Sequence, residues 1–265
     1  MSSHLQVICC PEITTGEDGL LRQRRVAEEL TSESAGPKLL IWRCVPTLFV
    51  SRSETRLRRF GEAVAHLRGL GWSVVVRKSG GTACPAGPGT VQLSLVEVAP
   101  AVVEMNAKYA ALAYFIRHTL SRYLHIDAQI APVSGAYCPG RYDLAVDGKK
   151  IAGLSQHWFR NAGGIRCVVT AASINIEEAA DLLARIVNQF YACTGSAVSC
   201  EPAMLTNVRV CSAKAKLPSA DSPSVVMNQF AASAERFADA ISEQFSNPIP
   251  ARDRIHWCAM QHRNS

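Results

Sequence analysis

Two residues of the sequence could take part directly in group-transfer chemistry, Cys138 and Lys150. Cys138 stands in a loop directly before Pro139-Gly140 and close to Arg141. Positive neighbours stabilise a thiolate, which is the nucleophilic form of a cysteine, and a thiolate can carry an acyl group as a thioester. From the residues alone, a purely structural role for this thiol stays open.

Lys150 lies in a predicted hairpin, because Asp147-Gly148 favours the positive φ angles of a tight two-residue turn. Regular pairing would place Lys150 on one face of the hairpin with Ala145 and Ala152. These small neighbours leave the ammonium group room to donate to a carbonyl or carboxylate. An exposed strand lysine without a chemical role remains the alternative. The expected pairs within residues 143–155 are Val146 with Lys149, Ala145 with Lys150, Leu144 with Ile151 and Asp143 with Ala152.

A glycine-containing segment over residues 77–83 is the second possible site. It reads Arg-Lys-Ser-Gly-Gly-Thr-Ala, and its glycines let the backbone approach a bound group and direct N–H donors at it. A phosphate or a carbonyl would suit such a loop. The segment is not a nucleotide-binding P-loop, because the Gly-Lys-Ser/Thr ending is absent. A plain connecting turn stays open as the alternative.

Hydrophobic spacing predicts the elements that must position these loops. We expect an α+β fold, in which helices pack on a mixed, antiparallel-rich β-sheet, with a small helical segment at the C-terminal end. Expected helices cover residues 17–30, 57–69 and 104–124. A fourth is expected to begin after Asn175 as its cap. A last helix is expected to carry an apolar stripe of Val226, Phe230, Phe237, Ile241 and Phe245. Expected strands cover residues 39–43, a buried strand at 72–77, then 90–96 and 166–171, with a loop over 78–89.

Length and composition restrict the class of protein. The chain has 265 residues, 48% of them hydrophobic and 19% charged, which excludes a disordered polymer and favours a main domain over residues 1–194 with a helical extension over 195–265. No apolar run approaches the roughly 20 residues needed to cross a bilayer, and residues 1–15 lack the order of a secretory signal. We therefore expect a cytoplasmic protein without a membrane partner.

The net charge of +6 favours an acidic partner. The basic residues are mostly scattered, and the sequence has neither zinc-finger spacing nor an aromatic RNA-binding motif, so nucleic acid is not the expected partner. The ten cysteines include no Cys-x-x-Cys pair, and we expect reduced thiols and no metal site.

Taken together, residues 77–83 and residues 142–153 resemble the two signatures of the biotin/lipoate protein ligase and transferase family. Residues 40–43, Leu-Ile-Trp-Arg, are similar to the family's upstream strand. The resemblance covers about residues 17–190. It implies a lipoate-protein ligase A-like catalytic domain over residues 1–194.

Within that family, residues 134–144 look most like the octanoyltransferase branch, in which a cysteine just before the hairpin is the nucleophile. The resemblance implies that Cys138 takes an octanoyl or lipoyl group as a thioester and yields it to the lysine of a lipoyl domain. Lys150 matches the lysine that contacts the acyl carbonyl in the family. The other implied substrate-binding residues are Arg77, Ser79, Gly80, Gly81, Thr82, Ala83, Tyr137, Ala145 and Gly153.

This resemblance implies no required cofactor, and it implies lipoyl domains or a glycine-cleavage-type carrier protein as partners, with acyl carrier protein as a further candidate donor. Many ligases have a His-Asp pair after the double glycine, whereas residues 84–89 here read Cys-Pro-Ala-Gly-Pro-Gly. That departure argues against adenylate chemistry. Two alternatives stay open, namely an ATP- and Mg²⁺-dependent lipoate ligase and a non-catalytic protein that binds acyl groups or lipoyl domains.

Two surfaces follow from this interpretation. An apolar groove for the acyl chain is expected along residues 74–76 and the face of Ala145 and Ala152, where each buried methylene would contribute about 0.8 kcal/mol. A basic face for an acidic carrier is expected on Arg52, Arg56, Arg58 and Arg59.

Overall fold

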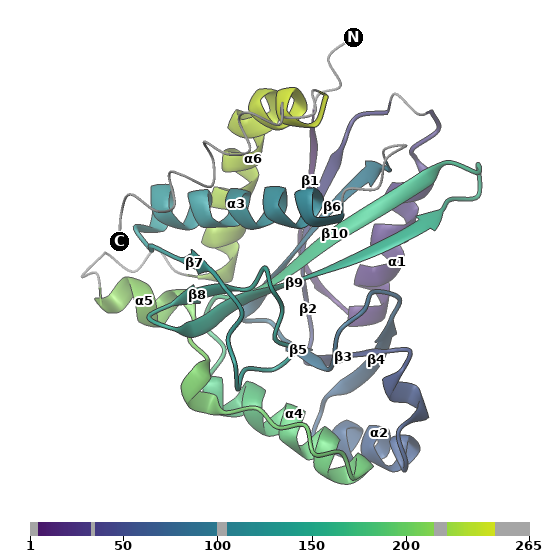
Figure 1. The fold of residues 1–265 in the computed structure, drawn as a ribbon, viewed down its shortest axis with the longest axis vertical. Coiled ribbons are helices and arrows are strands. Elements are labelled where there is room, and N and C mark those ends of the chain that lie inside the picture. Colours follow the sequence, from purple (N-terminus) through teal and green to yellow (C-terminus); the bar gives the residue numbers. More distant parts are fainter. Residues whose placement is uncertain (1–4, 33–34, 100–104, 215–221, 247–265) are drawn as a thin grey trace.

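The structure is a computed structural model in which helices pack on both faces of a large sheet (Figure 1). It describes residues 5–32, 35–99, 105–214 and 222–246, and for residues 214 and 235–246 it describes the backbone only. The predicted α+β class is confirmed. The helices are α1 (Gly16–Glu28), α2 (Phe60–Gly69), α3 (Met105–Leu124), α4 (Ala180–Thr194), α5 (Val208–Lys214) and α6 (Pro223–Ser246).

Within the described residues, the large sheet has seven strands in the order β1-β2-β6-β10-β9-β8-β7. Strands β1 and β2 pair in parallel and the other neighbours are antiparallel, so the predicted mixed sheet is confirmed. Its strands are β1 (Gln6–Thr14), β2 (Lys38–Cys44), β6 (Thr90–Val98), β7 (Gln129–Ile130), β8 (Leu144–Val146), β9 (Lys149–Arg160) and β10 (Arg166–Asn175). A smaller sheet joins β4 (Ser73–Arg77), β3 (Thr47–Ser51) and β5 (Cys84–Ala86).

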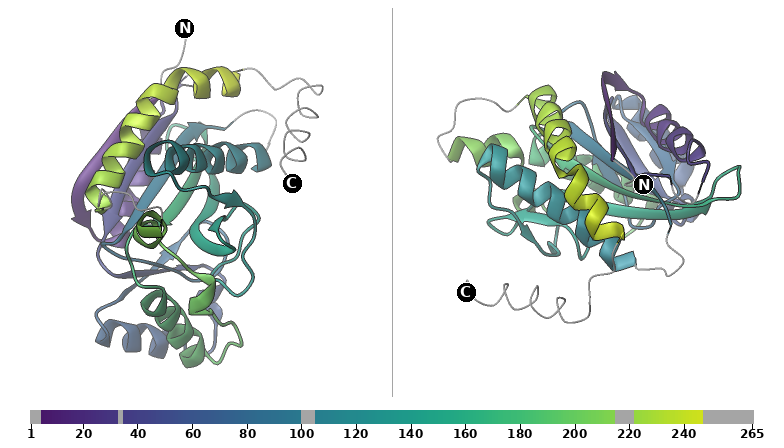
Figure 2. Two further views of the ribbon diagram at one scale, coloured as in Figure 1. Left: turned by 90° about the vertical axis from the view of Figure 1, so that its left-hand side faces the viewer. Right: turned by 90° about the horizontal axis from the view of Figure 1, so that it is seen from above.

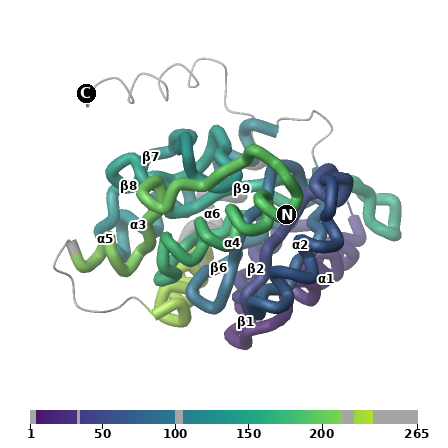
Figure 3. The backbone as a smooth tube through the Cα atoms, turned by 90° about the horizontal axis from the view of Figure 1, so that it is seen from below, coloured from purple at the N-terminus to yellow at the C-terminus, as the bar shows by residue number. Residues whose placement is uncertain are grey.

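Alternation of side chains along the strands gives the large sheet two different faces. One face carries residues such as Leu39, Leu93 and Ile174, which form the main core with α3 and α6. The opposite face is covered by α1 (Figure 2). Figure 3 shows α2 and α4 side by side, where Phe60 and Phe190 meet edge to face at 6.1 Å.

Thr15 caps the start of helix α1: its hydroxyl accepts a hydrogen bond from the backbone N–H of Asp18 at 3.0 Å. At the other end, the side chain of Asn161 donates to the carbonyls of Ala27 and Leu30. The tip of the β9–β10 hairpin therefore fixes the end of the helix that covers the second face of the sheet.

Gly19 lets α1 approach the sheet closely, because an added Cβ would lie 1.9 Å from the ring of Trp42. We expect Gly19→Ala to lower the free energy of unfolding by about 1–3 kcal/mol, the usual effect of overpacking. Gly69→Ala is the matched control, because Gly69 also lies in a helix and a Cβ added there would meet nothing within 4 Å. Urea unfolding compares the two variants; equal stability would contradict this account of α1 packing.

Three details of the predicted secondary structure are wrong. The segment over residues 72–77 is not a buried strand: β4 lies at the edge of the small sheet and Val76 is 44% exposed. The predicted loop over residues 78–89 contains β5. Asn175 is not a helix cap but the last residue of β10, and its side chain accepts from the backbone N–H of Glu178 to hold the following turn.

The described residues after 194 pack closely on the rest of the chain. Val226, Met227 and Phe230 are buried in the main core, with Phe230 5.9 Å from Phe115. The predicted stripe residues Phe237, Ile241 and Phe245 lie outside the residues whose side chains are described, and the domain boundary at 194 stays a prediction. Among the described residues, no helix has both the length and the apolar character needed to cross a membrane.

Candidate active site

The structure brings the two sites predicted from the sequence together at Cys138. Cys138 lies between β7 and β8 in the left-handed region, with φ of 42°, an uncommon conformation for a non-glycine residue. Its sulfur accepts hydrogen bonds from the backbone N–H of Thr82 at 3.2 Å and from Nη2 of Arg77 at 3.5 Å. One backbone donor and one cation therefore point at the thiol, an arrangement that stabilises negative charge on sulfur.

Gly81 is required where the two loops meet. Its φ is 97°, and an added Cβ would lie 2.7 Å from the sulfur of Cys138 and 2.8 Å from Nη2 of Arg77. The absence of a side chain thus lets this loop reach the thiol, as its glycines predicted.

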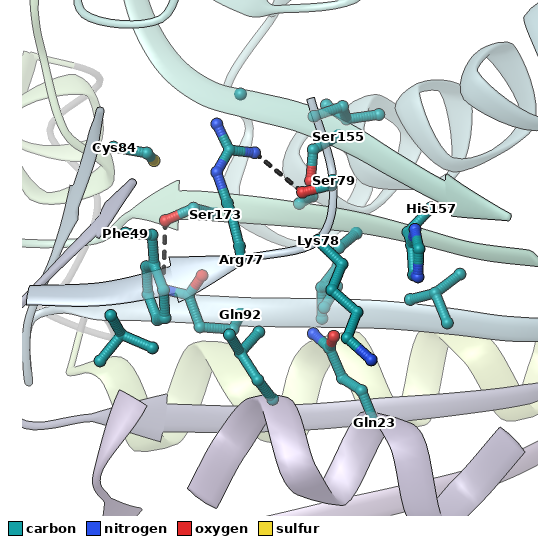
Figure 4. A pocket seen from close by; sticks show the side chains of 18 of the residues that line it. Gln23, Phe49, Arg77, Lys78, Ser79, Cys84, Gln92, Ser155, His157 and Ser173 are labelled. Carbon is teal, nitrogen blue, oxygen red and sulfur yellow. Dashed lines mark hydrogen bonds between the residues drawn. The ribbon is translucent and has the colours of Figure 1, made fainter. Parts of the chain in front are cut away.

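Arg77 holds the same loop from inside. Its guanidinium donates to the hydroxyl of Ser79 at 3.0 Å (Figure 4) and to the carbonyl of Thr82 at 2.8 Å. The buried Nε donor of Arg77 has no hydrogen-bond partner among the described residues. A donor of the site is therefore left for a bound acceptor group.

A buried carboxylate that sequence reasoning missed, Glu54, anchors the loop from the other side. Its Oε1 accepts from the backbone N–H of Ala83 at 2.9 Å and from the hydroxyl of Tyr191, and its Oε2 accepts from the backbone N–H of Ser51 at 2.7 Å. Burial and the neighbouring carboxylate of Glu54 raise the pKa of Tyr191. Because Ala83 is held in this way, the adjacent N–H of Thr82 is fixed toward the sulfur.

Glu54 is thus expected to act through the loop as a positioning residue. If Cys138 is the nucleophile of an acyl transfer, as the family resemblance implies, Glu54→Ala should lower kcat about 10- to 100-fold with a smaller change in KM, because a misplaced N–H donor costs stabilisation of developing charge. Glu54→Gln keeps one acceptor oxygen and should retain more activity. Alkylation of Cys138 by iodoacetamide reports the sulfur's surroundings directly, and a normal alkylation rate in Glu54→Ala would contradict the positioning role.

Lys150 is fully buried and its ammonium group holds the loop that carries Cys138. It donates to the carbonyls of Tyr137 at 3.0 Å and Cys138 at 2.8 Å, and pairs with the carboxylate of Asp143 at 2.9 Å. Burial raises the pKa of Asp143, and the charge of Lys150 opposes that shift. The exposed-lysine alternative is wrong, and three acceptors already engage the amine that was expected to contact an acyl carbonyl.

The predicted hairpin register is correct near the turn and wrong beyond it. Asp147-Gly148 has positive φ angles, and Ala145 pairs with Lys150 as expected. The register then shifts, so that Leu144 pairs with Ala152 instead of Ile151. Ala152 therefore joins the main core rather than the face of Lys150.

A cavity of about 490 Å³ opens beside the thiol, between the large sheet, α1 and β4. Its floor follows from the strand register, which aligns Trp42, Gln92, Ser173 and Gly153 across four strands. The small side chain of Ser173 and the absence of one at Gly153 leave space that larger residues would fill. Cys138, Lys150, Arg77 and Ser79 also line this cavity.

The predicted apolar groove corresponds in part to this cavity, and its role in holding an acyl chain stays a prediction. Residues 74–76 line the cavity, whereas Ala145 and Ala152 do not. Ala145 instead packs in the cluster around Leu48 and Tyr191, so this half of the prediction is wrong. The cavity has a second thiol, Cys84, whose pKa is raised to about 11 by burial.

Other predicted residues act through the backbone or lie apart. Tyr137 is buried and contributes its carbonyl to Lys150, and burial raises the pKa of its phenol well above the usual range. Gly80 is exposed and is not part of the cavity wall. No group of three or more potential metal ligands lies together in the part of the chain that the structure describes.

Comparison of the sequence with models of known protein families shows which family the chain belongs to. The model of the lipoyl protein ligase A/B catalytic domain matches residues 17–235, most of the chain. The chain belongs to the lipoyl protein ligase A/B family. The family resemblance predicted from residues 77–83 and 142–153 is therefore confirmed.

Relatives within the family carry a transferase name. The octanoyl-GcvH:protein N-octanoyltransferase of Kyrpidia tusciae is 34% identical over 188 residues, which cover 67% of this chain and 62% of the relative. The protein of the same name from Anoxybacillus flavithermus is 30% identical over 155 residues, covering 58% and 55%. The chain thus spans little more than half the length of these curated relatives.

Solved structures confirm the fold. Lipoate-protein ligase A bound with ATP has a TM-score of 0.61 at 14% identity, over 92% of this chain and 95% of that one. A bipartite lipoate protein ligase from Thermoplasma acidophilum, studied with its lipoyl domain, has a TM-score of 0.54 at 14% identity, over 94% and 95%. The sheet and helices of this chain are those of the ligase family.

Proposed function

We propose that the protein is an acyltransferase that moves an octanoyl or lipoyl group from a carrier protein to the lysine of a lipoyl domain through a thioester on Cys138. The observation that carries the proposal is the position of the Cys138 sulfur, which lines an apolar-walled cavity and accepts from Thr82 and Arg77. The transferase names of the relatives support the same reaction, and the glycine-cleavage-type carrier is the proposed donor.

The reaction exchanges one acyl bond for another. The thiolate of Cys138 attacks the acyl carbonyl carbon of the donor, the carbon–sulfur bond forms, and the donor's amine leaves with the proton that the thiol gave up. The amine of the acceptor lysine then attacks the thioester, and the sulfur leaves and regains a proton. Donors near the sulfur, including Thr82 N–H and Arg77, stabilise the charge that develops.

Because the exchange balances without another reactant, it consumes no nucleotide, and we expect no required cofactor. The test is octanoyl transfer between two purified carrier domains with no nucleotide present, compared with loading of a lipoyl domain from free octanoate, ATP and Mg²⁺. We expect modification in the first reaction alone. Modification in the second reaction alone would establish ligation instead. Modification in neither reaction would indicate a non-catalytic protein that binds acyl groups or lipoyl domains.

A further inference from the structure

The floor of the cavity contains two hydrogen-bonding side chains, Gln92 and Ser173, that the proposed reaction does not use. They pair across β6 and β10, and both line the cavity. The side-chain nitrogen of Gln92, Nε2, donates to the hydroxyl oxygen of Ser173 at 3.1 Å and to that of Thr90 at 2.8 Å. Figure 4 shows the contact between Gln92 and Ser173 inside the cavity.

Thr90 fixes which end of the Gln92 amide points toward it. The hydroxyl of Thr90 donates its single hydrogen to the carbonyl of Gly87 at 2.9 Å, and it accepts from the backbone N–H of Gly87 at 3.1 Å. Because this hydroxyl has no second hydrogen to give, the group of Gln92 that approaches it must be the nitrogen and not the oxygen. The side-chain oxygen of Gln92, Oε1, is therefore directed elsewhere.

This arrangement leaves one acceptor and one donor of the pair unused. Among the described residues, Oε1 of Gln92 accepts no hydrogen bond. The hydroxyl of Ser173 accepts from Gln92, and its own hydrogen has no acceptor in the described part of the chain. Gln92 is only 6% exposed. Polar groups at such buried positions are ordinarily satisfied, so a ligand or an ordered water must complete this pair.

The pair lies where an acyl chain on Cys138 would pass. Ser173 pairs with Gly153, and a Cβ added to Gly153 would lie 2.9 Å from Nζ of Lys150. The same Nζ donates to the carbonyl of Cys138 at 2.8 Å. Neighbouring strands lie about 4.8 Å apart, which places Ser173 about 5 Å and Gln92 about 10 Å from Gly153. The far carbons of an eight-carbon chain would therefore reach the pair.

The surroundings of the pair are apolar. Trp42 is the neighbour of Gln92 on the next strand, and its ring meets that of Phe49 edge to face at 6.3 Å. Leu20 and Val75 line the cavity as well. In a cavity of this kind, the few polar groups fix which ligand binds and in which orientation.

A hydroxyl group matches the two unused positions. It can donate to Oε1 of Gln92 and accept from the hydroxyl of Ser173, whereas a carboxylate can only accept and an ammonium group can only donate. A plain alkyl chain over the pair would remove both groups from water without replacing their hydrogen bonds, which is unfavourable.

We propose that the cavity selects acyl chains that carry a hydroxyl group over Gln92 and Ser173, in preference to the plain octanoyl chain. This inference rests on the proposed function, because the chain is held as a thioester on Cys138, and it names the class of acyl group that the site distinguishes. Ordered water is the competing occupant, since water that completes the pair beneath a plain chain would abolish the preference.

The first arm of the test follows acylation of Cys138 by intact-protein mass. The donors are small thioesters of octanoate and of hydroxyoctanoates with the hydroxyl on the sixth, seventh or eighth carbon. We expect at least one hydroxyoctanoyl thioester to acylate the wild type about 10-fold faster than the octanoyl thioester at equal, low concentration. Equal rates would overturn the proposal and leave water as the occupant. A wild type that no thioester acylates would remove the proposed function and this inference with it.

The second arm measures the same ratio of rates in variants of the pair. Gln92→Met and Ser173→Ala each remove one partner of the hydroxyl, and the ratio should fall to within about twofold of one. Ser155→Ala is the matched control, because Ser155 is another half-buried serine of the cavity wall but pairs with Ala171 instead of Ser173. Its ratio should equal that of the wild type.

The ratio separates recognition from folding. Both rates are measured on one protein, so a partly unfolded variant lowers them equally and leaves their ratio unchanged. A wild-type ratio that persists in Gln92→Met and Ser173→Ala would overturn the proposal, while acylation of Cys138 in the same samples would leave the proposed function standing.

Discussion

Cys138→Ser is expected to lower octanoyl transfer between carrier domains by at least about a thousandfold. Serine keeps the shape of the site, but its hydroxyl is far less readily ionised than a thiol, and the donors around it are a backbone N–H and an arginine rather than a general base. The measurement is the initial rate of transfer followed by mass spectrometry of the acceptor domain.

Cys84→Ser provides the comparison, because Cys84 is the other thiol of the cavity and burial raises its pKa to about 11. It is expected to lose less than about tenfold, since a protonated thiol is a poor nucleophile. If Cys138→Ser transferred the acyl group at the wild-type rate while Cys84→Ser did not, the assignment of the nucleophile would be wrong.

Lys150→Met is the second large effect we expect. The change leaves the buried Asp143 carboxylate without its cation and two carbonyls of the Cys138 loop without their donor. Breaking a buried ion pair by removing one partner costs about 3–5 kcal/mol, so stability should fall together with transfer, which we expect to drop more than about 100-fold. Chemical unfolding and transfer assays measure the two losses separately.

A double variant separates stability from activity. Lys150→Met with Asp143→Asn removes both buried charges and should recover much of the stability, because replacing a whole buried pair is often close to neutral. Transfer should stay low, since the carbonyls of Tyr137 and Cys138 still lack their donor. Full recovery of transfer in the double variant would show that Lys150 serves only charge balance.

Local signals predicted much of the fold. Helix α1 was predicted as residues 17–30 and spans Gly16–Glu28, because apolar spacing is a property of a short segment. The Asp147-Gly148 turn was equally predictable, since its positive φ angles depend on those two residues. The family motifs also predicted the importance of Cys138 and of the loop of Gly81, whereas the contact between them is visible only in the structure.

The register of the hairpin could not be predicted in the same way. Alternation assumes one residue opposite one residue, but the shift after Ala145 moves Ala152 into the main core. The shift is accompanied by polar contacts of Lys150 with Asp143 and the Cys138 loop, which no short pattern of apolar residues encodes.

Glu54 illustrates the same limit for the site. In the sequence it stands between arginines, where a solvated charged segment is the ordinary interpretation. Its role depends on a contact with Tyr191, 137 residues away, and on the N–H of Ala83. The exposure of Val76 was missed for a related reason, since its valine-rich strand lies at the edge of a small sheet and lines a cavity.

The most direct test of the account follows a single octanoyl group with no nucleotide present. Wild-type protein is mixed with an octanoylated carrier, its intact mass and peptide masses are recorded, and an unmodified lipoyl domain is then added. The account predicts an octanoyl mass on Cys138 that disappears as the same mass appears on the lysine of the lipoyl domain, at a rate no slower than overall transfer. Transfer that proceeds with no adduct on Cys138, or that begins only when ATP is supplied, would contradict it.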